Sequence, residues 1–87
     1  MVSKKYTIKN EQGLHMRPAG MVTKEMMKFN SDVNFVVNGA TVNAKSIMNV
    51  MAACIKCGTE IEVQCNGADE EAALAKFDEL YNNGFGE

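Results

Sequence analysis

The amino-acid sequence predicts an α+β fold, in which three helices pack on one face of a four-stranded antiparallel sheet. Two observations support this prediction. Strand-like and helix-like segments follow one another in the order βαββαβα along the chain. The clearest strand has one apolar and one polar face, and the three helices are amphipathic. Packing every helix on the same side of the sheet therefore buries the most apolar surface.

The first part of the chain predicts a strand, a loop and a helix. Residues 2–8 give a weak strand signal, with polar Thr7 between two apolar residues, and residues 10–13 have the composition of a loop. Over residues 16 to about 28, apolar residues recur at spacings of three and four, which indicates an amphipathic helix. A proline is tolerated in the first turn of such a helix, where Pro18 stands. The apolar face of this helix is formed by Ala19, Val22, Met26 and Phe29.

The middle of the chain predicts a β-hairpin and a second helix. Residues 32–37 are rich in Val and Phe, and Asn38-Gly39 separates them from a short strand at 40–43. Asn-Gly between two such runs is the strongest short-range hairpin signal, because both turn residues need a positive φ. The second helix is expected to begin near Ser46, whose hydroxyl can cap the first free amides, and to end before Gly58.

The last third of the chain predicts a strand and a final helix. Residues 60–65 alternate strictly, which is typical of a strand with one buried and one exposed side. Asn66-Gly67 is the next turn, and Asp69 is expected to cap a helix that ends near Gly84. The expected buried faces consist of Ile61, Val63 and Cys65 in the strand, and of Ala73, Leu74, Phe77, Leu80 and Tyr81 in the helix.

The composition limits the classes of function. Eighty-seven residues, 46% hydrophobic and 23% charged, suffice for one domain over residues 1–87 but not for a deep substrate pocket as well. The nine basic residues are spread along the chain and the net charge is −2, so we expect no direct nucleic-acid partner. No run approaches the roughly 20 apolar residues that span a bilayer, and the N-terminus has no apolar signal core. We therefore expect a cytoplasmic protein that does not insert into membranes.

The three cysteines are an odd number, which in a reducing compartment favours free thiols over disulfides. Cys54 and Cys57 form a Cys-x-x-Cys motif, a pattern found in metal and redox sites, and on a helix this spacing brings both sulfurs to roughly one face. A tetrahedral zinc site needs four ligands, and only Cys65 and the distant His15 remain. We expect no metal ligands and no cofactor, and keep a small metallochaperone or redox domain as the alternative function.

The strongest functional signal is the segment 13–20, Gly-Leu-His-Met-Arg-Pro-Ala-Gly, which contains the only histidine. His15 lies at the expected start of the first helix, where the amides of Met16 and Arg17 lack helical partners and favour an anion. The Arg17 guanidinium keeps its charge and can hold phosphate oxygens in a fork. This combination suits the receipt and release of a phosphoryl group, which needs mainly positioning and charge stabilisation. On spacing alone, a capping or surface histidine is the simpler interpretation.

Two segments of the sequence resemble motifs of the HPr family, the phosphocarriers of the bacterial phosphoenolpyruvate-dependent sugar phosphotransferase system. Residues 13–19 resemble its phosphohistidine motif, and residues 43–48, Asn-Ala-Lys-Ser-Ile-Met, resemble its regulatory-serine segment as seen in Gram-positive bacteria. The resemblance covers the full chain and implies an open-faced β-sandwich. It implies that His15 accepts a phosphoryl group through Nδ1 from phosphorylated enzyme I and passes it to sugar-specific enzyme IIA domains, assisted by Arg17. We expect a monomeric phosphocarrier, not an enzyme.

The resemblance also implies regulation at Ser46. In the family an ATP-dependent kinase/phosphatase acts on the matching serine, and the phosphorylated product binds a catabolite-control transcription factor. A helix N-cap explains the serine without any regulation, and the two roles are compatible. A relative that acts only through this serine would lack the histidine, so the presence of His15 favours the carrier.

Partners are expected to dock beside the two phosphorylation sites. In the family, residues matching Ile47 and Met48 are exposed near the histidine, and flexible thioethers suit a surface that accepts several partners. Two positions depart from the family pattern. Met16 stands where alanine is most common, and Cys54 stands where glycine is common, which strains the helix end if a positive φ is required there. The predicted docking residues are Met16, Pro18, Gly20, Ile47, Met48 and Met51.

Overall fold

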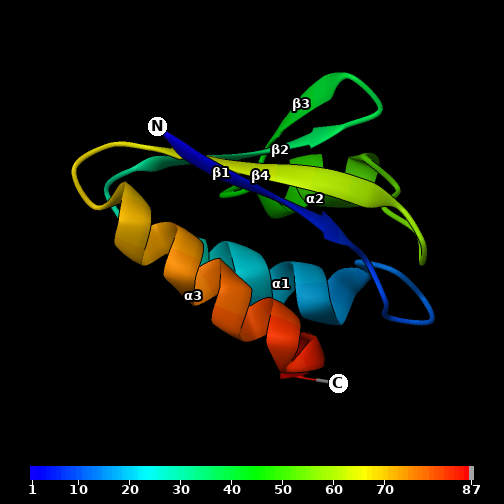
Figure 1. Ribbon diagram of the computed structural model, residues 1–87. Helices are drawn as coiled ribbons and strands as arrows, with labels where there is room; N and C mark the ends of the chain where they lie inside the picture. The colour runs from blue at the N-terminus through cyan, green and yellow to red at the C-terminus, as the bar shows by residue number, and fades with distance from the viewer. Residues whose placement is uncertain (87) are drawn as a thin grey trace.

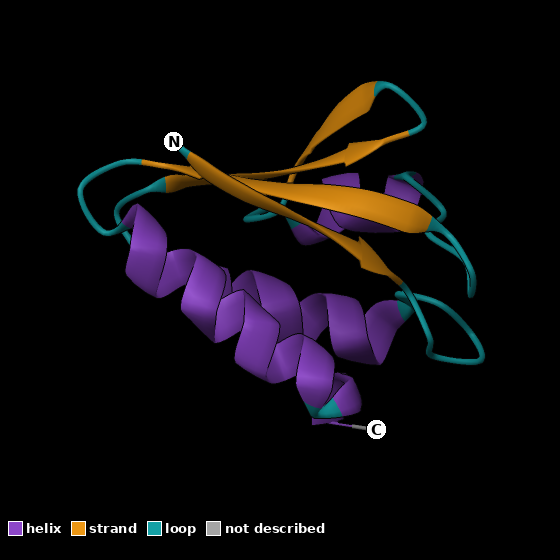
Figure 2. Ribbon diagram, viewed as in Figure 1, coloured by secondary structure: helices purple, strands orange, loops and turns teal. Residues whose placement is uncertain are grey.

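Four strands form one antiparallel sheet in the computed structural model, which describes residues 1–86 (Figure 1). In sheet order they are β1 (Val2–Thr7), β4 (Glu60–Asn66), β2 (Asp32–Val37) and β3 (Ala40–Asn43). The helices are α1 (Met16–Met26), α2 (Ile47–Ala52) and α3 (Glu70–Asn82), followed by a short 3-10 turn, η1 (Gly84–Gly86). The helices lie on the same face of the sheet (Figure 2), so the predicted fold class and element order are confirmed.

The sheet has one buried and one solvent-facing side because its strands alternate apolar and polar residues. The register keeps the apolar residues together: Tyr6 lies opposite Ile61, and Val33 lies opposite Cys65. The alternation predicted for residues 60–65 is confirmed. The buried side chains of the sheet are Tyr6, Val33, Phe35, Val37, Ile61, Val63 and Cys65.

The hairpin between β2 and β3 turns at Asn38-Gly39, as the sequence predicts. The φ angle is +51° at Asn38 and +81° at Gly39. Val37 pairs with Ala40 directly across this two-residue turn. Two successive positive φ angles match the right-handed twist of the strands, which explains the choice of Asn and Gly.

Phe77 of α3 is the aromatic centre of the core. Its ring centroid lies 4.9 Å from that of Tyr6, 5.5 Å from that of Phe35 and 5.7 Å from that of Phe85. Tilted and edge-to-face contacts of this kind add to the free energy gained by burying the rings. Because they join β1, β2, α3 and η1, the C-terminal turn is built into the core.

The side chain of Asp69 binds the segment before β2 and makes no capping hydrogen bond to its own helix. Asp69 is the N-cap residue of α3, but its side chain makes no capping hydrogen bond, so the prediction that it caps this helix is wrong. Its carboxylate instead accepts hydrogen bonds from the amides of Asn30 and Ser31, at 2.8 Å each, and from the Ser31 hydroxyl. Three donors converge here just before β2. The Ser31 hydroxyl, followed by the Asn30 amide, lowers the pKa of Asp69.

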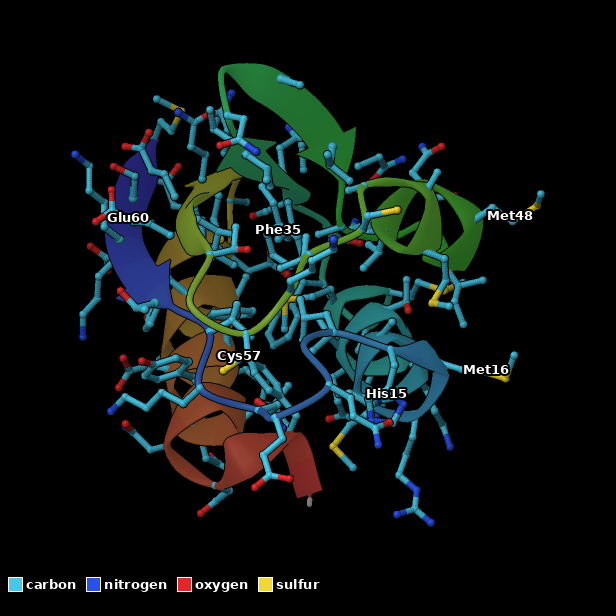
Figure 3. The ribbon with its side chains drawn as sticks, turned by 90° about the vertical axis from the view of Figure 1, so that its right-hand side faces the viewer. His15, Met16, Phe35, Met48, Cys57 and Glu60 are labelled. Atoms are coloured by element: carbon cyan, nitrogen blue, oxygen red, sulfur yellow. The ribbon has the colours of Figure 1, made fainter. Side chains whose placement is uncertain are left out.

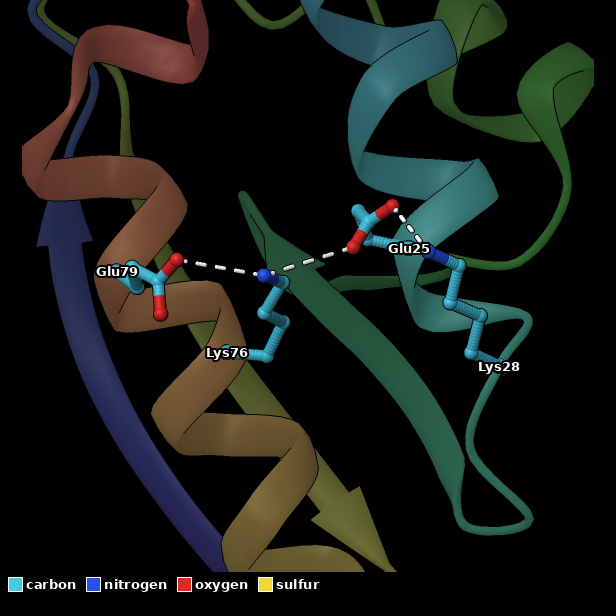
Figure 4. A network of polar contacts seen from close by, with 4 residues as sticks. All are labelled: Glu25, Lys28, Lys76 and Glu79. Carbon is cyan, nitrogen blue, oxygen red and sulfur yellow. Dashed lines mark hydrogen bonds and ion pairs between the residues drawn. The ribbon is translucent and has the colours of Figure 1, made fainter.

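A surface network of ion pairs joins α1 to α3 (Figure 4). Lys76 of α3 lies 3.6 Å from the carboxylate of Glu25 and 3.3 Å from that of Glu79, and Glu25 also contacts Lys28 at 2.9 Å. The hydrogen bond from Lys28 lowers the pKa of Glu25. Exposed pairs contribute little stability each, so the position of α1 depends chiefly on its buried face. That face contains Pro18, Ala19, Val22, Thr23 and Met26.

Candidate functional site

His15 is the N-cap residue of α1, where its backbone is extended. Its carbonyl accepts the amide of Ala19 at 2.9 Å, but its side chain does not cap the helix. Pro18 has no amide hydrogen. Among the described residues, the amides of Met16 and Arg17 find no hydrogen-bond acceptor. The half-exposed imidazole therefore lies at a helix end whose free donors and positive dipole favour an anion.

The backbone immediately before His15 is clamped to the segment that follows α2. The Leu14 amide donates to the Ile55 carbonyl at 2.9 Å, and both side chains are buried. Gly13 lies so close to the backbone of this segment that a Cβ atom at this position would lie 2.1 Å from the Ile55 carbonyl oxygen. Its φ is +68°, so only glycine fits without a shift of the backbone. This contact fixes where the chain enters α1.

The C-terminal region braces the same loop from the other side. The Asn10 side-chain amide donates to the Gly84 carbonyl at 3.0 Å, and the Tyr81 hydroxyl donates to the Thr7 carbonyl at 2.7 Å. These contacts span 74 residues of sequence, and no local pattern indicates them. An open cleft of about 570 Å³ lies between the loop and the end of α3, lined by Lys9, Asn10, Glu11, Gln12, His15, Tyr81, Asn82 and Gly84.

Arg17 lies two residues beyond His15 and is exposed. Within the described part of the chain its guanidinium forms no ion pair. A guanidinium that is already neutralised by a carboxylate would be less able to bind a phosphate. Arg17 is therefore available for a charge-assisted hydrogen bond to an anion that reaches the helix start.

Exposed apolar side chains of α1 and α2 lie on the side of the molecule that carries the histidine. The two helices pack against each other, and a Cβ atom at Gly20 would lie 3.6 Å from the Ile47 side chain. Met16 and Met48 project outward on the same side of the molecule as His15 (Figure 3). We call the exposed residues Met16, Ile47, Met48 and Met51 the methionine patch.

Two residues predicted for the docking surface, Pro18 and Gly20, are not exposed. Pro18 is fully buried, so its ring offers no contact to a partner, contrary to the prediction. The reason is its place in the first turn of α1, on the side that faces the core. Gly20 is half-buried beside Ile47, where the lack of a side chain allows α2 to approach.

Ser46 is the N-cap residue of α2, as the sequence predicts. Its hydroxyl oxygen accepts a hydrogen bond from the Asn49 amide at 3.3 Å, and its carbonyl accepts one from the Val50 amide at 3.0 Å. The side chain is half-buried, next to exposed Ile47 and Met48. Ser46 thus holds its own helix while bordering the methionine patch.

The cysteines do not form the arrangement expected from their spacing. Helix α2 ends at Ala52, and Cys54 has a φ of +53°, so Cys54 and Cys57 do not share a helical face and that premise is wrong. Both are exposed free thiols, whereas Cys65 is buried in β4. Over residues 1–86, no group of three His, Cys, Asp or Glu side chains is arranged to hold a metal ion.

Comparison with known proteins shows the family of this chain. The model of the family described as "PTS HPr component phosphorylation site" matches residues 2–83. The chain belongs to the HPr family. It is 41% identical over 87 residues to phosphocarrier protein HPr of Treponema pallidum, covering 100% of this chain and 99% of the relative. A crystal structure of HPr from Thermoanaerobacter tengcongensis superposes with a TM-score of 0.96 at 36% identity, covering 100% of this chain and 98% of that one.

Family membership makes the chain a phosphocarrier of the sugar phosphotransferase system, not an enzyme with its own turnover, and it favours this function over the metallochaperone alternative. The HPr-like protein Crh of Bacillus subtilis is 41% identical over 77 residues, which cover 88% of this chain and 91% of Crh. A crystal structure of Crh, described as a catabolite repression protein and a domain-swapped dimer, has a TM-score of 0.75. Among the described residues, no helix is long and apolar enough to cross a membrane.

Proposed function

We propose that the chain accepts a phosphoryl group on His15 from phosphorylated enzyme I and passes it to sugar-specific enzyme IIA domains. The observation that carries this proposal is the open start of α1. A half-exposed imidazole lies beside two amides without helical acceptors and two residues from an exposed guanidinium. Membership of the HPr family supports the identity of the donor and the acceptor.

The reaction replaces one bond to phosphorus by another. A nitrogen of the His15 imidazole, Nδ1 according to the family resemblance, attacks the phosphorus atom while the bond to the donor breaks. The acceptor in enzyme IIA then attacks the same phosphorus, and the imidazole leaves with the electron pair of the P–N bond. Each partner supplies the rest of the reaction site, so this chain needs no enclosed pocket.

Arg17 and the start of α1 stabilise the phosphorylated state. The phosphoryl group adds negative charge beside the amides of Met16 and Arg17, and the helix dipole favours an anion there. The Arg17 guanidinium can donate two parallel hydrogen bonds to phosphate oxygens. These groups are set in position before the reaction, which is how charge stabilisation lowers a barrier.

We propose a second, regulatory phosphorylation at Ser46 by an ATP-dependent kinase/phosphatase. The half-buried hydroxyl borders the methionine patch, so a phosphate there adds about two negative charges to the surface on which partners dock. A helix start tolerates this charge, so the fold should persist. The family resemblance supports a catabolite-control transcription factor as the reader of this signal, and Crh supports the link to catabolite repression.

Residues 1–87 act as a single cytoplasmic domain, with partners docking on the methionine patch beside Gly20. The chain acts as a monomer, in contrast to the Crh dimer, because each transfer needs the His15 face uncovered.

Phosphorylation at His15 is tested by incubating the chain with phosphoenolpyruvate, enzyme I and Mg²⁺ and measuring its intact mass. We expect one added phosphate that is labile in acid and absent from His15→Ala. Arg17→Ala should slow the transfer by about a hundredfold, the scale for removing one charge-stabilising donor. No mass gain in the presence of active enzyme I would overturn the proposal.

Phosphorylation at Ser46 is tested with an HPr-directed kinase and ATP. We expect an acid-stable phosphate that is absent from Ser46→Ala and retained in Ser3→Ala, because Ser3 is an exposed serine on β1 away from α2. Retention of the phosphate in Ser46→Ala would assign the modification to another residue and exclude Ser46.

A further inference from the structure

The methionines of the chain differ sharply in exposure. Met16 and Met48 are 70% and 79% exposed and Met51 is 37% exposed, whereas Met26 of the core is 0% exposed. A large thioether that stands in solvent gains little from packing. It is, however, open to small oxidants that cannot reach a buried methionine.

Three of the exposed thioethers belong to the methionine patch. Met16 follows His15 directly, and Met48 follows Ile47, whose side chain would lie 3.6 Å from a Cβ atom at Gly20 of α1. Met16 and Met48 also project outward on the same side of the molecule as His15 (Figure 3), so a change of their polarity alters the surface beside the histidine.

Oxidation changes these side chains in a defined way. A methionine sulfur attacks one oxygen of hydrogen peroxide, the O–O bond breaks, and a sulfoxide and one water molecule form. The sulfur is oxidised by two electrons and the peroxide is reduced by two. The product is polar and chiral, and it no longer packs as a flexible apolar side chain.

We propose that Met16, Met48 and Met51 make the docking surface oxidation-sensitive: a peroxide converts them to sulfoxides, which weakens docking of the phosphotransfer partners, and a methionine sulfoxide reductase restores it. The inference rests on the proposed function, since it regulates the same site. Oxidation should raise the KM for phosphorylated enzyme I by about tenfold, the effect of losing roughly one buried methionine contact. The folded core remains, because Met26 is out of reach.

The experiment uses the full chain with Cys54→Ser and Cys57→Ser, so that the exposed thiols do not react. Hydrogen peroxide is titrated in, peptide masses locate each added oxygen, and the rate of phosphoryl transfer is measured against enzyme I concentration. We expect oxygen at Met16, Met48 and Met51 but not at Met26, a raised KM, and recovery with a methionine sulfoxide reductase and dithiothreitol.

Leucine variants separate this effect from general damage. Met16→Leu/Met48→Leu/Met51→Leu conserves side-chain volume and should keep its KM after peroxide. Met27→Leu, which removes another exposed thioether, should remain as sensitive as its parent. An unchanged KM after oxidation of all three residues, or equal sensitivity of the triple variant, overturns this inference alone. Failure of the untreated protein to accept a phosphoryl group overturns the proposed function and this inference with it.

Discussion

The start of α1 and the start of α2 are held in different ways. Ser46 caps its own helix, because its hydroxyl accepts the Asn49 amide. His15 does not cap α1 with its side chain, and the chain before it is fixed instead by Leu14 and Gly13 against Ile55. The His15 side chain thus makes no capping hydrogen bond to α1, and the segment before it fixes the start of the helix. The free amides at α1 remain available to an anion.

This difference predicts unequal consequences of phosphorylation at the two helix starts. A phosphate on His15 adds an acceptor where donors are free. A phosphate on Ser46 is attached to the oxygen that already accepts the Asn49 amide, so the cap must be rebuilt around the phosphate oxygens. The first event is therefore expected to leave the backbone unchanged, and the second to shift the first turn of α2 slightly.

The largest effect is expected from Gly13→Ala, which disrupts the packing of the chain before His15 against Ile55. The new methyl group would lie 2.1 Å from the Ile55 carbonyl oxygen at a φ of +68°. We expect a loss of about 3–4 kcal/mol in the free energy of unfolding, from overpacking and left-handed strain together. Urea unfolding measures this loss, and the phosphorylation rate of His15 should fall as well.

Gly39→Ala is the matched control for Gly13→Ala. Its φ is +81°, but nothing lies within 4 Å of the added methyl group. It should therefore lose only the strain, about 1 kcal/mol, with no change in phosphorylation. Equal losses in the two variants would show that the clamp against Ile55 contributes nothing beyond the backbone angle.

The start of α3 differs from those of α1 and α2, because the side chain of its N-cap residue Asp69 binds the segment before β2. Asp69→Ala removes the acceptor of three hydrogen bonds at Asn30 and Ser31, so at pH 7 it should lower Tm by more than Ser46→Ala does. Hydrogen bonding lowers the pKa of Asp69 in the folded state. Its contribution is therefore complete above the unfolded pKa of about 3.9 and is lost as the pH falls through the folded pKa.

Thermal unfolding followed by circular dichroism from pH 7 down to about pH 2 checks this pH dependence. The difference in Tm between the parent and Asp69→Ala should shrink below about pH 4. Asp32→Ala is the control, because Asp32 is an exposed carboxylate at the start of β2. A difference that grows toward low pH would contradict the assigned role.

The sequence predicted the features that depend on neighbouring residues. The Asn38-Gly39 turn, the Ser46 cap and the position of His15 at a helix start all follow from local chemistry. The contacts of Asp69 and Gly13 did not follow, because each joins segments about 40 residues apart through tertiary packing. The burial of Pro18 was missed for a related reason, since a first-turn proline can face solvent or core and only the packing of α1 decides.

Ser46→Ala removes the self-supporting cap of α2 and should have a moderate effect. The loss of one N-cap hydrogen bond costs about 1 kcal/mol in the free energy of unfolding. Ser46→Asn retains a capping oxygen and should recover most of that loss. Neither substitution should change the intrinsic phosphorylation of His15, and a large decrease in that rate for both would mean that the two helix starts are coupled.

The smallest effect is expected at the other end of α2, from Cys54→Gly. The φ of +53° at Cys54 confirms that this position needs the left-handed conformation, which strains any residue with a Cβ atom. Glycine relieves that strain but loses more entropy on folding, so the net gain in the free energy of unfolding should be about 0.5 kcal/mol. Cys57→Gly, at an exposed position without a positive φ, should be destabilising instead.

Because Cys54 directly precedes Ile55, urea unfolding and His15 phosphorylation should be measured together. A gain in stability with an unchanged transfer rate would mean that the clamp on Leu14 tolerates relaxation of its neighbour. A loss of stability would contradict the strain.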